Sequence, residues 1–383
     1  MRRYLDWNAT AIPDPRVIEG LREAFASAWG NASSLHADGR RAAEQADTAR
    51  EELAGWTSSR PQEWILTSGS TEALHTGILG TWLARSPARR IVSSQGEHEA
   101  VLEALSLAER LGAETFRVPL DGQGRWDPEA VLRACDTDTA LVALIWAGNE
   151  TGAVSDVQAL AEELSRREIP LLLDATQAVG RLPVDLSRLP ANLITISGHK
   201  IGAPKGIGAL FVRSGTPWLP WMRGGGQERG RRGGTTNAPG AAGFAEAIRI
   251  ARARGIPSDW AAQRARFEAL LQERLPEVQI ASAEAERLPN TTCALIPGVD
   301  SQSLLNRLDA LGFAVSSGSA CSSGRTEPSH VLTAMGIPDA LAHGALRIST
   351  GPATPWEDLA ALLDVLPREA ARIRSLGAGW LRT

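Results

Sequence analysis

The segment LITISGHKIG, residues 193–202, places Lys200 directly after a short run of aliphatic and β-branched residues. Such a run, bounded by small and polar residues, predicts a buried β-strand. A lysine at the end of a buried strand is poorly explained as a solvated charge, because burial disfavours the ammonium form and lowers the pKa of the amine. A neutral amine condenses with an aldehyde, so a Schiff-base lysine competes here with an ordinary loop lysine.

A carboxylate stands at the end of the strand predicted just before it. In LLLDATQ, residues 171–177, three leucines are followed by Asp174. A lysine that holds an aldehyde and an acid that keeps a pyridine nitrogen protonated are the two groups with which proteins use pyridoxal phosphate. The pair Asp174 and Lys200 therefore predicts a pyridoxal-phosphate site.

The surrounding chain predicts an α/β fold. Short apolar runs alternate with amphipathic stretches, which favours a large domain with a mainly parallel sheet of seven strands flanked by helices. The strands are expected at residues 64–66, 90–92, 115–118, 140–145, 171–173, 193–196 and 208–212. Ligands collect at the carboxyl ends of such strands. Polar groups follow five of them, at residues 68–71, 97–98 and 148–150 and at Asp174 and Lys200.

The pattern changes after about residue 238, where longer helices and fewer strands predict a smaller α+β domain. We expect a large domain at residues 15–250, and a small one formed by residues 1–14 with 251–383. Residues 354–357 match a capping box with proline at the first helical position. The helix that it opens has an apolar face made by Leu359, Leu362, Leu363 and Leu366.

Four further groups are candidates for chemistry, each with an ordinary alternative. Ser70 and Thr71 open a helix and could hold a phosphate, or simply cap that helix. His98 could stack on a pyridine ring and move protons, or serve as a cap. Arg347 lies inside an apolar strand and needs an anion, either a substrate carboxylate or a structural carboxylate. Cys321 lies in a loop of small residues, which favours an accessible nucleophile over a packed thiol.

Composition gives no reason to expect nucleic acid or a membrane as a partner. The net charge is −4, and no stretch approaches the length of a membrane span. The three cysteines, Cys135, Cys293 and Cys321, are an odd number and widely spaced, which argues for a reducing cytoplasm. The first residues lack the apolar core of a signal peptide. We expect a cytoplasmic protein and no metal site.

Nearly the whole chain resembles the cysteine desulfurases of the NifS and IscS kind, which are class V, fold-type I enzymes of pyridoxal phosphate. The matching stretches are residues 4–6, 68–72, 97–98, 149–152, 174–177, 197–200, 224–230 and 316–321. The resemblance implies a homodimer that removes sulfur from L-cysteine, leaving L-alanine and a persulfide on the enzyme. It also implies a sulfur-acceptor protein, either an iron–sulfur scaffold or a carrier for tRNA thiolation.

The resemblance assigns a role to each matching residue. Lys200 would form the Schiff base, Asp174 would pair with the pyridine nitrogen, and His98 would stack on the ring. Cys321 would attack the substrate sulfur. Gln177 would bond the phenolic oxygen of the cofactor. The cofactor phosphate would be bound by Ser70, Thr71, Ser197 and His199, with a further contact from Thr235 of the second subunit. Asn149 and Arg347 would bind the substrate carboxylate.

Some positions depart from the family pattern, and other functions compete. Ala73-Leu74-His75, Gly148 and Gln227 stand where polar residues are common, but none is a proposed catalytic group. A selenocysteine lyase or an aminotransferase of the same class is the nearest enzyme alternative, and the aminotransferase would not need Cys321. A catalytically silent relative that serves as a binding subunit is the alternative of another class.

Overall fold

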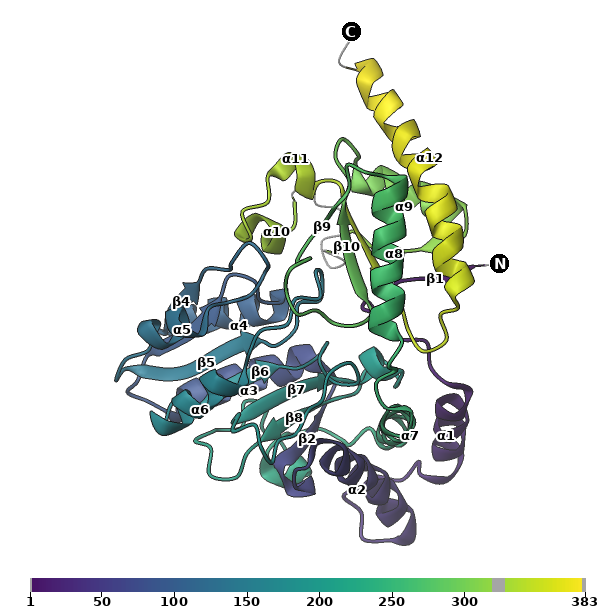
Figure 1. Ribbon diagram of the computed structural model, residues 1–383. Helices are drawn as coiled ribbons and strands as arrows, with labels where there is room; N and C mark the ends of the chain where they lie inside the picture. Colours follow the sequence, from purple (N-terminus) through teal and green to yellow (C-terminus); the bar gives the residue numbers. More distant parts are fainter. Residues whose placement is uncertain (1, 319–327, 381–383) are drawn as a thin grey trace.

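A seven-stranded sheet organises the larger part of the computed structural model, which describes residues 2–318 and 328–380 (Figure 1). The strand order is β2-β8-β7-β6-β5-β3-β4. Only β8 runs against its neighbours, so the predicted mainly parallel sheet of seven strands is confirmed. The strands are β2 Trp64–Thr67, β3 Arg90–Ser94, β4 Glu114–Val118, β5 Thr139–Ile145, β6 Leu171–Asp174, β7 Leu193–Ser197 and β8 Gly208–Val212.

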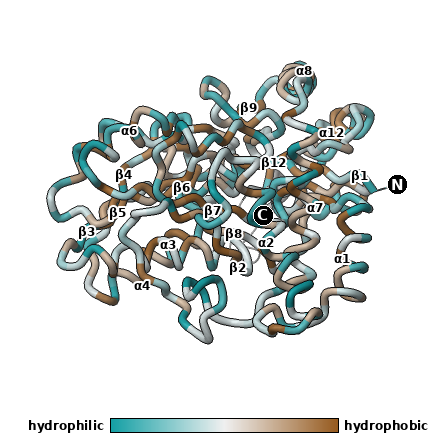
Figure 2. The backbone as a smooth tube through the Cα atoms, turned by 90° about the horizontal axis from the view of Figure 1, so that it is seen from below, coloured by the Kyte–Doolittle hydropathy of each residue, from teal (hydrophilic) through white to brown (hydrophobic). Residues whose placement is uncertain are grey.

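Helices cover both faces of this sheet. The apolar side chains of α3 (Ser70–Ala84) and α4 (Glu99–Arg110) pack on one face, where Leu172 and Leu193 belong to the same core. The other face is covered by α2 (Ala37–Thr57), α5 (Pro128–Ala134), α6 (Gln158–Arg166) and α7 (Ala238–Arg254), while α1 (Pro15–Ser27) lies against α7. Because both faces are buried, the central strands are continuously apolar, as their brown colour in Figure 2 shows.

The second region is built on a small antiparallel sheet with the order β12-β10-β9. Its core joins Leu5, from the start of the chain, to the predicted apolar face of α12, whose four leucines are all buried. The strands of this sheet are β9 (Gln279–Ile280), β10 (Thr291–Leu295) and β12 (Ala345–Ser349). The other elements of this region are β1 (Arg3–Tyr4), α8 (Trp260–Arg274), α9 (Ser301–Ala310), β11 (Phe313–Ala314), α10 (His330–Ala334), α11 (Asp339–Ala342) and α12 (Trp356–Trp380).

The predicted capping box at the start of α12 is wrong. The helix begins at Trp356, and the Thr354 hydroxyl accepts a hydrogen bond from the Gly351 N–H at 2.9 Å instead of capping the helix. A threonine hydroxyl can satisfy a turn as readily as a helix end, and the sequence pattern does not separate the two. We propose that residues 1–14 and 251–383 form the smaller domain, because Leu5 shares the core of the second sheet.

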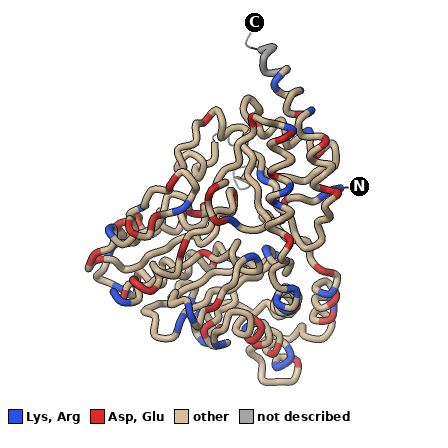
Figure 3. Tube along the Cα trace, in the orientation of Figure 1, with Lys and Arg blue, Asp and Glu red and all other residues tan. Residues whose placement is uncertain are grey.

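Acidic and basic side chains are mixed along the helices, without a long block of one sign on any single element (Figure 3). In the part of the chain that the structure describes, none of the helices combines the length and the apolar character that crossing a membrane requires.

Candidate active site

A cavity of about 630 Å³ opens at the carboxyl ends of β3, β6 and β7 and the N-terminus of α3. The structure brings most of the predicted site residues into it: Ser70, Thr71, His98, Asn149, Asp174, Gln177, Ser197, His199, Lys200 and Arg347 all line its wall. Thr235 is exposed and does not line the cavity of its own chain. Cys321 lies outside the described residues, but Gly318 and His330, from either side of that gap, also line the cavity.

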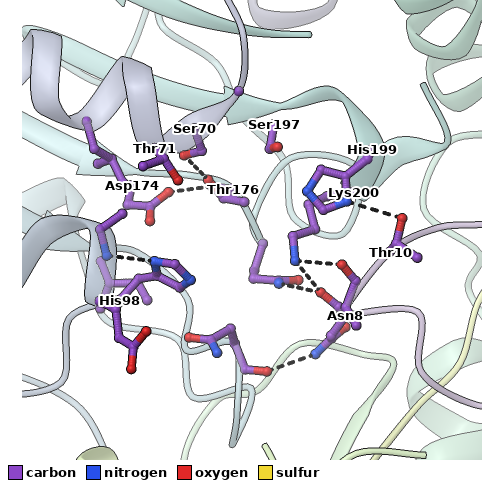
Figure 4. A pocket seen from close by; sticks show the side chains of 18 of the residues that line it. Asn8, Thr10, Ser70, Thr71, His98, Asp174, Thr176, Ser197, His199 and Lys200 are labelled. Carbon is purple, nitrogen blue, oxygen red and sulfur yellow. Dashed lines mark hydrogen bonds between the residues drawn. The ribbon is translucent and has the colours of Figure 1, made fainter. Parts of the chain in front are cut away.

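Lys200 lies in the short 3-10 turn η2 (Gly198–Ile201) that follows β7. Its Nζ donates to the backbone carbonyl oxygens of Asn8 at 2.6 Å and Ala9 at 3.0 Å (Figure 4). The turn needs glycine at position 198, because a Cβ there would lie 2.9 Å from the carbonyl oxygen of Ile207. The lysine is therefore held by the N-terminal segment, on the far side of the cavity from His98.

Asp174 is fixed at the end of β6 by two donors. Its Oδ1 accepts from the Thr195 hydroxyl and from the Thr176 backbone N–H, each at 3.0 Å. These bonds fix the carboxylate at the cavity wall, and an acid held in this way is the kind of group that pairs with the pyridine nitrogen in pyridoxal-phosphate sites. Nearby, Gln177 donates through Nε2 to the Asn8 carbonyl at 3.0 Å. Its buried Oε1 has no hydrogen-bond partner among the described residues.

The N-terminus of α3 forms the anion-binding end of the cavity. Its N-cap residue, Gly69, offers no side-chain cap, so the first-turn N–H groups can bind an anion together with the helix dipole. The backbone is kept close by Gly208, where a Cβ would lie 2.7 Å from the Gly69 Cα. The Ser70 hydroxyl bonds that of Thr176 at 2.6 Å. A phosphate fits this donor set.

His199 contributes a neutral imidazole beside these groups. Burial, reinforced by the positive charge of Lys200, lowers its pKa to about 4. Its Nδ1 lies 3.2 Å from the Thr10 hydroxyl, which fixes the ring (Figure 4). A neutral ring can donate one hydrogen bond to a phosphate without adding a charge that must be desolvated.

His98 is the N-cap of α4 and has a fixed orientation. Its Nδ1 accepts the backbone N–H of Ala100 at 3.1 Å, so the proton of the neutral ring lies on Nε2. The ring projects into the same space as Asp174 and Lys200 (Figure 4). The same side chain thus caps a helix and faces the cavity, so the cap is present and leaves the predicted role toward a pyridine ring open.

Arg347, on β12, is only 1% exposed and is held mainly by the protein itself. Nη2 forms an ion pair with Asp6 at 2.7 Å, and Nη1 donates to the carbonyl oxygens of Asn149 at 3.1 Å and Gly318 at 3.2 Å. The structural salt bridge, the alternative for this residue, is therefore present. Nε is buried and has no partner in the described part of the chain, so the protein leaves one donor of this guanidinium unsatisfied.

The sequence did not single out Asn8, yet it connects the site to the second region. Its side chain is fully buried, donates to Thr291 Oγ1 at 2.9 Å and accepts from Asn290 Nδ2 at 3.2 Å. Its carbonyl accepts from both Lys200 and Gln177. Its only sequence signal is that it stands two residues after the family-matching stretch 4–6. That position does not predict a contact between Asn8 and a residue more than 160 positions away, such as Gln177.

Two buried carboxyl groups in the cavity wall, Glu97 and Glu150, belong to the polar groups predicted at strand ends, but the sequence assigned them no role. Glu97 has no exposed surface, and burial, with a further contribution from the charge of Asp174, raises its pKa to about 8. Ser94 donates to its Oε1 at 2.5 Å, while Oε2 is unpaired within the described residues. Burial also raises the pKa of Glu150, whose Oε2 accepts from Ser329 at 2.6 Å. Nothing in the local sequence distinguishes a buried glutamate from a solvated one.

The donor set fits pyridoxal phosphate. A helix N-terminus lies at one end, a fixed carboxylate and an imidazole lie along the wall, and a lysine amine lies opposite the imidazole. The buried, unpaired Gln177 Oε1 marks a further polar contact that the protein alone does not satisfy. We assign the cavity to this cofactor, and the roles of single residues toward it stay predictions.

Comparisons with known proteins agree with this assignment. The model of the aminotransferase class-V family matches residues 3–362. A cysteine desulfurase of Cereibacter sphaeroides is 40% identical, covering 98% of this chain and 97% of the relative. The solved structure of a NifS-like protein superposes with a TM-score of 0.88 at 32% identity, covering 96% of this chain and 99% of that one.

A third comparison concerns a structure solved with a small molecule. The structure of SspA in complex with cysteine superposes with a TM-score of 0.82 at 28% identity, covering 92% of this chain and all of that one, 100%. Because the family model spans most of the chain and the relatives match it end to end, the chain belongs to the class-V aminotransferase family and, within it, to the pyridoxal-phosphate-dependent cysteine desulfurases.

Proposed function

We propose that this protein removes sulfur from L-cysteine, releases L-alanine and carries the sulfur as a persulfide on Cys321 to an acceptor protein. One observation carries the proposal. A single cavity joins the lysine amine, the fixed carboxylate, the phosphate-binding helix end and Arg347, and residues from both sides of the segment that contains Cys321 line it.

The chain's own residues would position both reactants. Asp174, fixed by Thr195 and Thr176, would keep the cofactor's pyridine nitrogen protonated, while His98 faces the ring and the start of α3 holds the phosphate. The bound cofactor supplies an electron sink that makes carbanion chemistry at the substrate carbons accessible. Lys200 would hold the cofactor, and the carbonyls of Asn8 and Ala9 would receive its amine whenever the lysine is displaced.

The substrate carboxylate would bind at Arg347 and Asn149. Arg347 Nε is buried without a partner, and the Asn149 side chain lines the same wall. The Cys321 thiolate would attack the sulfur of the bound cysteine, so that an S–S bond forms as the C–S bond breaks. The electron pair of the broken bond stays with the substrate carbon, which takes a proton and leaves as alanine. A thiol reductant would then release the persulfide sulfur as sulfide.

Three further features belong to the same proposal. Thr235 is exposed and does not line the cavity of its own chain, which supports the prediction that it serves the site of a second subunit in a homodimer. The acceptor would be an iron–sulfur scaffold or a carrier for tRNA thiolation. A cytoplasmic location is proposed because two of the three cysteines, Cys135 and Cys293, are free.

The test uses the purified protein with its cofactor. We expect a visible absorption band, and after addition of L-cysteine we expect alanine and sulfide in amounts that depend on a reductant. Cys321→Ser should keep the band and lose sulfide release, whereas Lys200→Ala should lose the band of the lysine-bound cofactor. Unchanged sulfide release in Cys321→Ser would remove the persulfide mechanism. A band without alanine formation would favour the aminotransferase or selenocysteine reaction.

A further inference from the structure

A second cavity, of about 270 Å³, lies on the other side of Lys200 from the cofactor site. Its lining comes from Trp7 and residues 11–17 of the N-terminal segment, the turn at residues 179–181, η2, the end of α7, Trp260 and residues 350–353. A single buried water needs only roughly 10–15 Å³ in such a measure, so the space is large enough for an organic ligand. Lys200 lines both cavities.

Arg181 gives this cavity a buried positive charge that the protein does not neutralise. Arg181 is only 5% exposed, and its Nη1 donates to the Gln177 carbonyl oxygen at 3.2 Å. Within residues 2–318 and 328–380 it forms no ion pair. Burial, together with the positive charges of Arg254 and Arg347, lowers its pKa to about 10, so it remains a cation at neutral pH. A buried charge without a counter-ion is costly, and buried arginines are normally paired with an anion.

The other charges of the lining add to this field. Arg254, exposed on the last turn of α7, places its guanidinium 5.8 Å from the centre of the Trp260 ring. Among the lining residues the acidic one is Asp14, at the rim, and it is already paired with Arg16 at 2.9 Å. The contact with Arg16 lowers the pKa of Asp14 to about 2, so it stays ionised and engaged. The interior therefore offers positive charge to a ligand.

The walls select the rest of the ligand. They are largely apolar and include two indole rings, those of Trp7 and Trp260, together with aliphatic side chains such as Ile12, Val179 and Ile250. A planar guanidinium pairs best with a carboxylate, and aromatic walls favour an apolar or aromatic body. A phosphate would need more donors than Arg181 provides. An amino acid would bring an ammonium group next to the positive charges of Arg181 and Arg254, which disfavours both cysteine and alanine.

We propose that the cavity behind Lys200 is a binding site for a small monocarboxylate with an apolar body and no amino group, held by Arg181. Its carboxylate neutralises the buried guanidinium, and its apolar part lies between the indole rings. Such a ligand lies on the opposite side of the catalytic lysine from the cofactor and does not compete with L-cysteine for Arg347. The proposal does not depend on the identity of the sulfur acceptor or on the persulfide step.

Calorimetric titration of the cofactor-loaded protein at constant ionic strength tests the proposal, with benzoate as the probe and neutral benzamide as its matched control. We expect benzoate to bind at least about tenfold more tightly than benzamide, the usual effect of a charge-assisted hydrogen bond in a buried site. Arg181→Met should remove this preference. Equal binding of the two compounds, unchanged benzoate binding in Arg181→Met, or no benzoate binding at all would overturn the proposal.

Two further variants locate the bound probe. Arg254→Glu changes an exposed residue at the rim and should weaken benzoate binding severalfold by reversing a nearby charge. Arg252→Glu makes the same change on the same helix turn, away from the cavity lining, and should leave the affinity within about twofold because exposed charges are screened by solvent. These two changes lie on the surface and test the site even if Arg181→Met does not fold. Equal effects of both would contradict the assignment. Loss of benzoate binding in Arg347→Met would place the probe in the cofactor cavity and likewise overturn it.

Discussion

Glu97→Gln should remove a pH dependence from the stability of this protein. The Glu97 carboxyl is fully buried and its pKa is raised to about 8; Ser94 donates to Oε1, and Oε2 is unpaired within the described residues. The charge of Asp174 adds to the rise of this pKa, and His330 Nε2 contacts the Glu97 carbonyl oxygen at 3.0 Å. A buried carboxyl next to Asp174 keeps its proton, and glutamine reproduces that neutral form.

The sign and the size of this pH dependence follow from the linkage between proton binding and unfolding. The folded protein holds a proton on Glu97 that the unfolded chain releases above about pH 4.5, so the unfolding free energy of the parent protein falls as pH rises from about 4.5 to 8. The glutamine variant lacks this slope. A difference of about 3.5 pKa units corresponds to an upper limit of about 5 kcal/mol, and relaxation of the site reduces it to a few kcal/mol in favour of the variant at pH 9.

Urea unfolding of both proteins at pH 5, 7 and 9 measures this difference. Glu103→Gln is the control, because Glu103 is exposed on the neighbouring helix α4 and its replacement should leave the pH slope unchanged. If Glu97→Gln and the parent protein show parallel stability curves between pH 5 and 9, the carboxyl is ionised throughout and the reasoning fails.

Two other substitutions test the contacts that hold the site. Asp6→Asn should lower the unfolding free energy by about 2–3 kcal/mol, less than for a fully buried pair because the Asp6 side chain is 19% exposed. It should also lower KM for L-cysteine, because Arg347 is left without its counter-charge. The control is Asp309→Asn, which breaks an exposed pair with Arg2 and should lower the free energy of thermal unfolding by at most about 0.5 kcal/mol. Thr195→Val should weaken cofactor binding roughly tenfold in a fluorescence titration by removing a buried donor to Asp174, whereas Thr76→Val, at a buried hydroxyl that is unpaired in the described chain, should leave it unchanged.

The sheet could be predicted from the sequence because its strands carry their own signal. A strand buried on both faces is a short, continuous apolar run, and Leu171–Asp174 and Leu193–Ser197 have this form. The carboxyl ends of parallel strands meet at one edge, so Asp174 and Lys200 could be placed together before any coordinates were known. Strand ends are local features, and local features are what a sequence pattern records.

The partners that fix those side chains could not be predicted in the same way. Thr195 points at Asp174 because two neighbouring strands are in register, and Asp6 reaches Arg347 across 341 residues of chain. The charge states of Glu97 and Glu150 depend on burial, which arises only when several elements pack together. The apparent capping box at Thr354 is a different kind of error, because the local pattern was present but the Thr354 hydroxyl accepts from the Gly351 N–H instead of capping the helix.

The N-terminal segment shows why the site cannot be understood from the large sheet alone. Asn8 accepts from Lys200 and Gln177 through its carbonyl, while its side chain bonds Asn290 and Thr291 in the second region. Its backbone N–H also donates at 2.9 Å to the hydroxyl of Ser349, which lies two residues after Arg347 in β12. The position of the lysine amine is therefore tied to the packing of β10 and β12. Because a fully buried polar hub loses several hydrogen bonds at once if either region shifts, movement of the smaller region relative to the sheet must also move the carbonyls that hold Lys200.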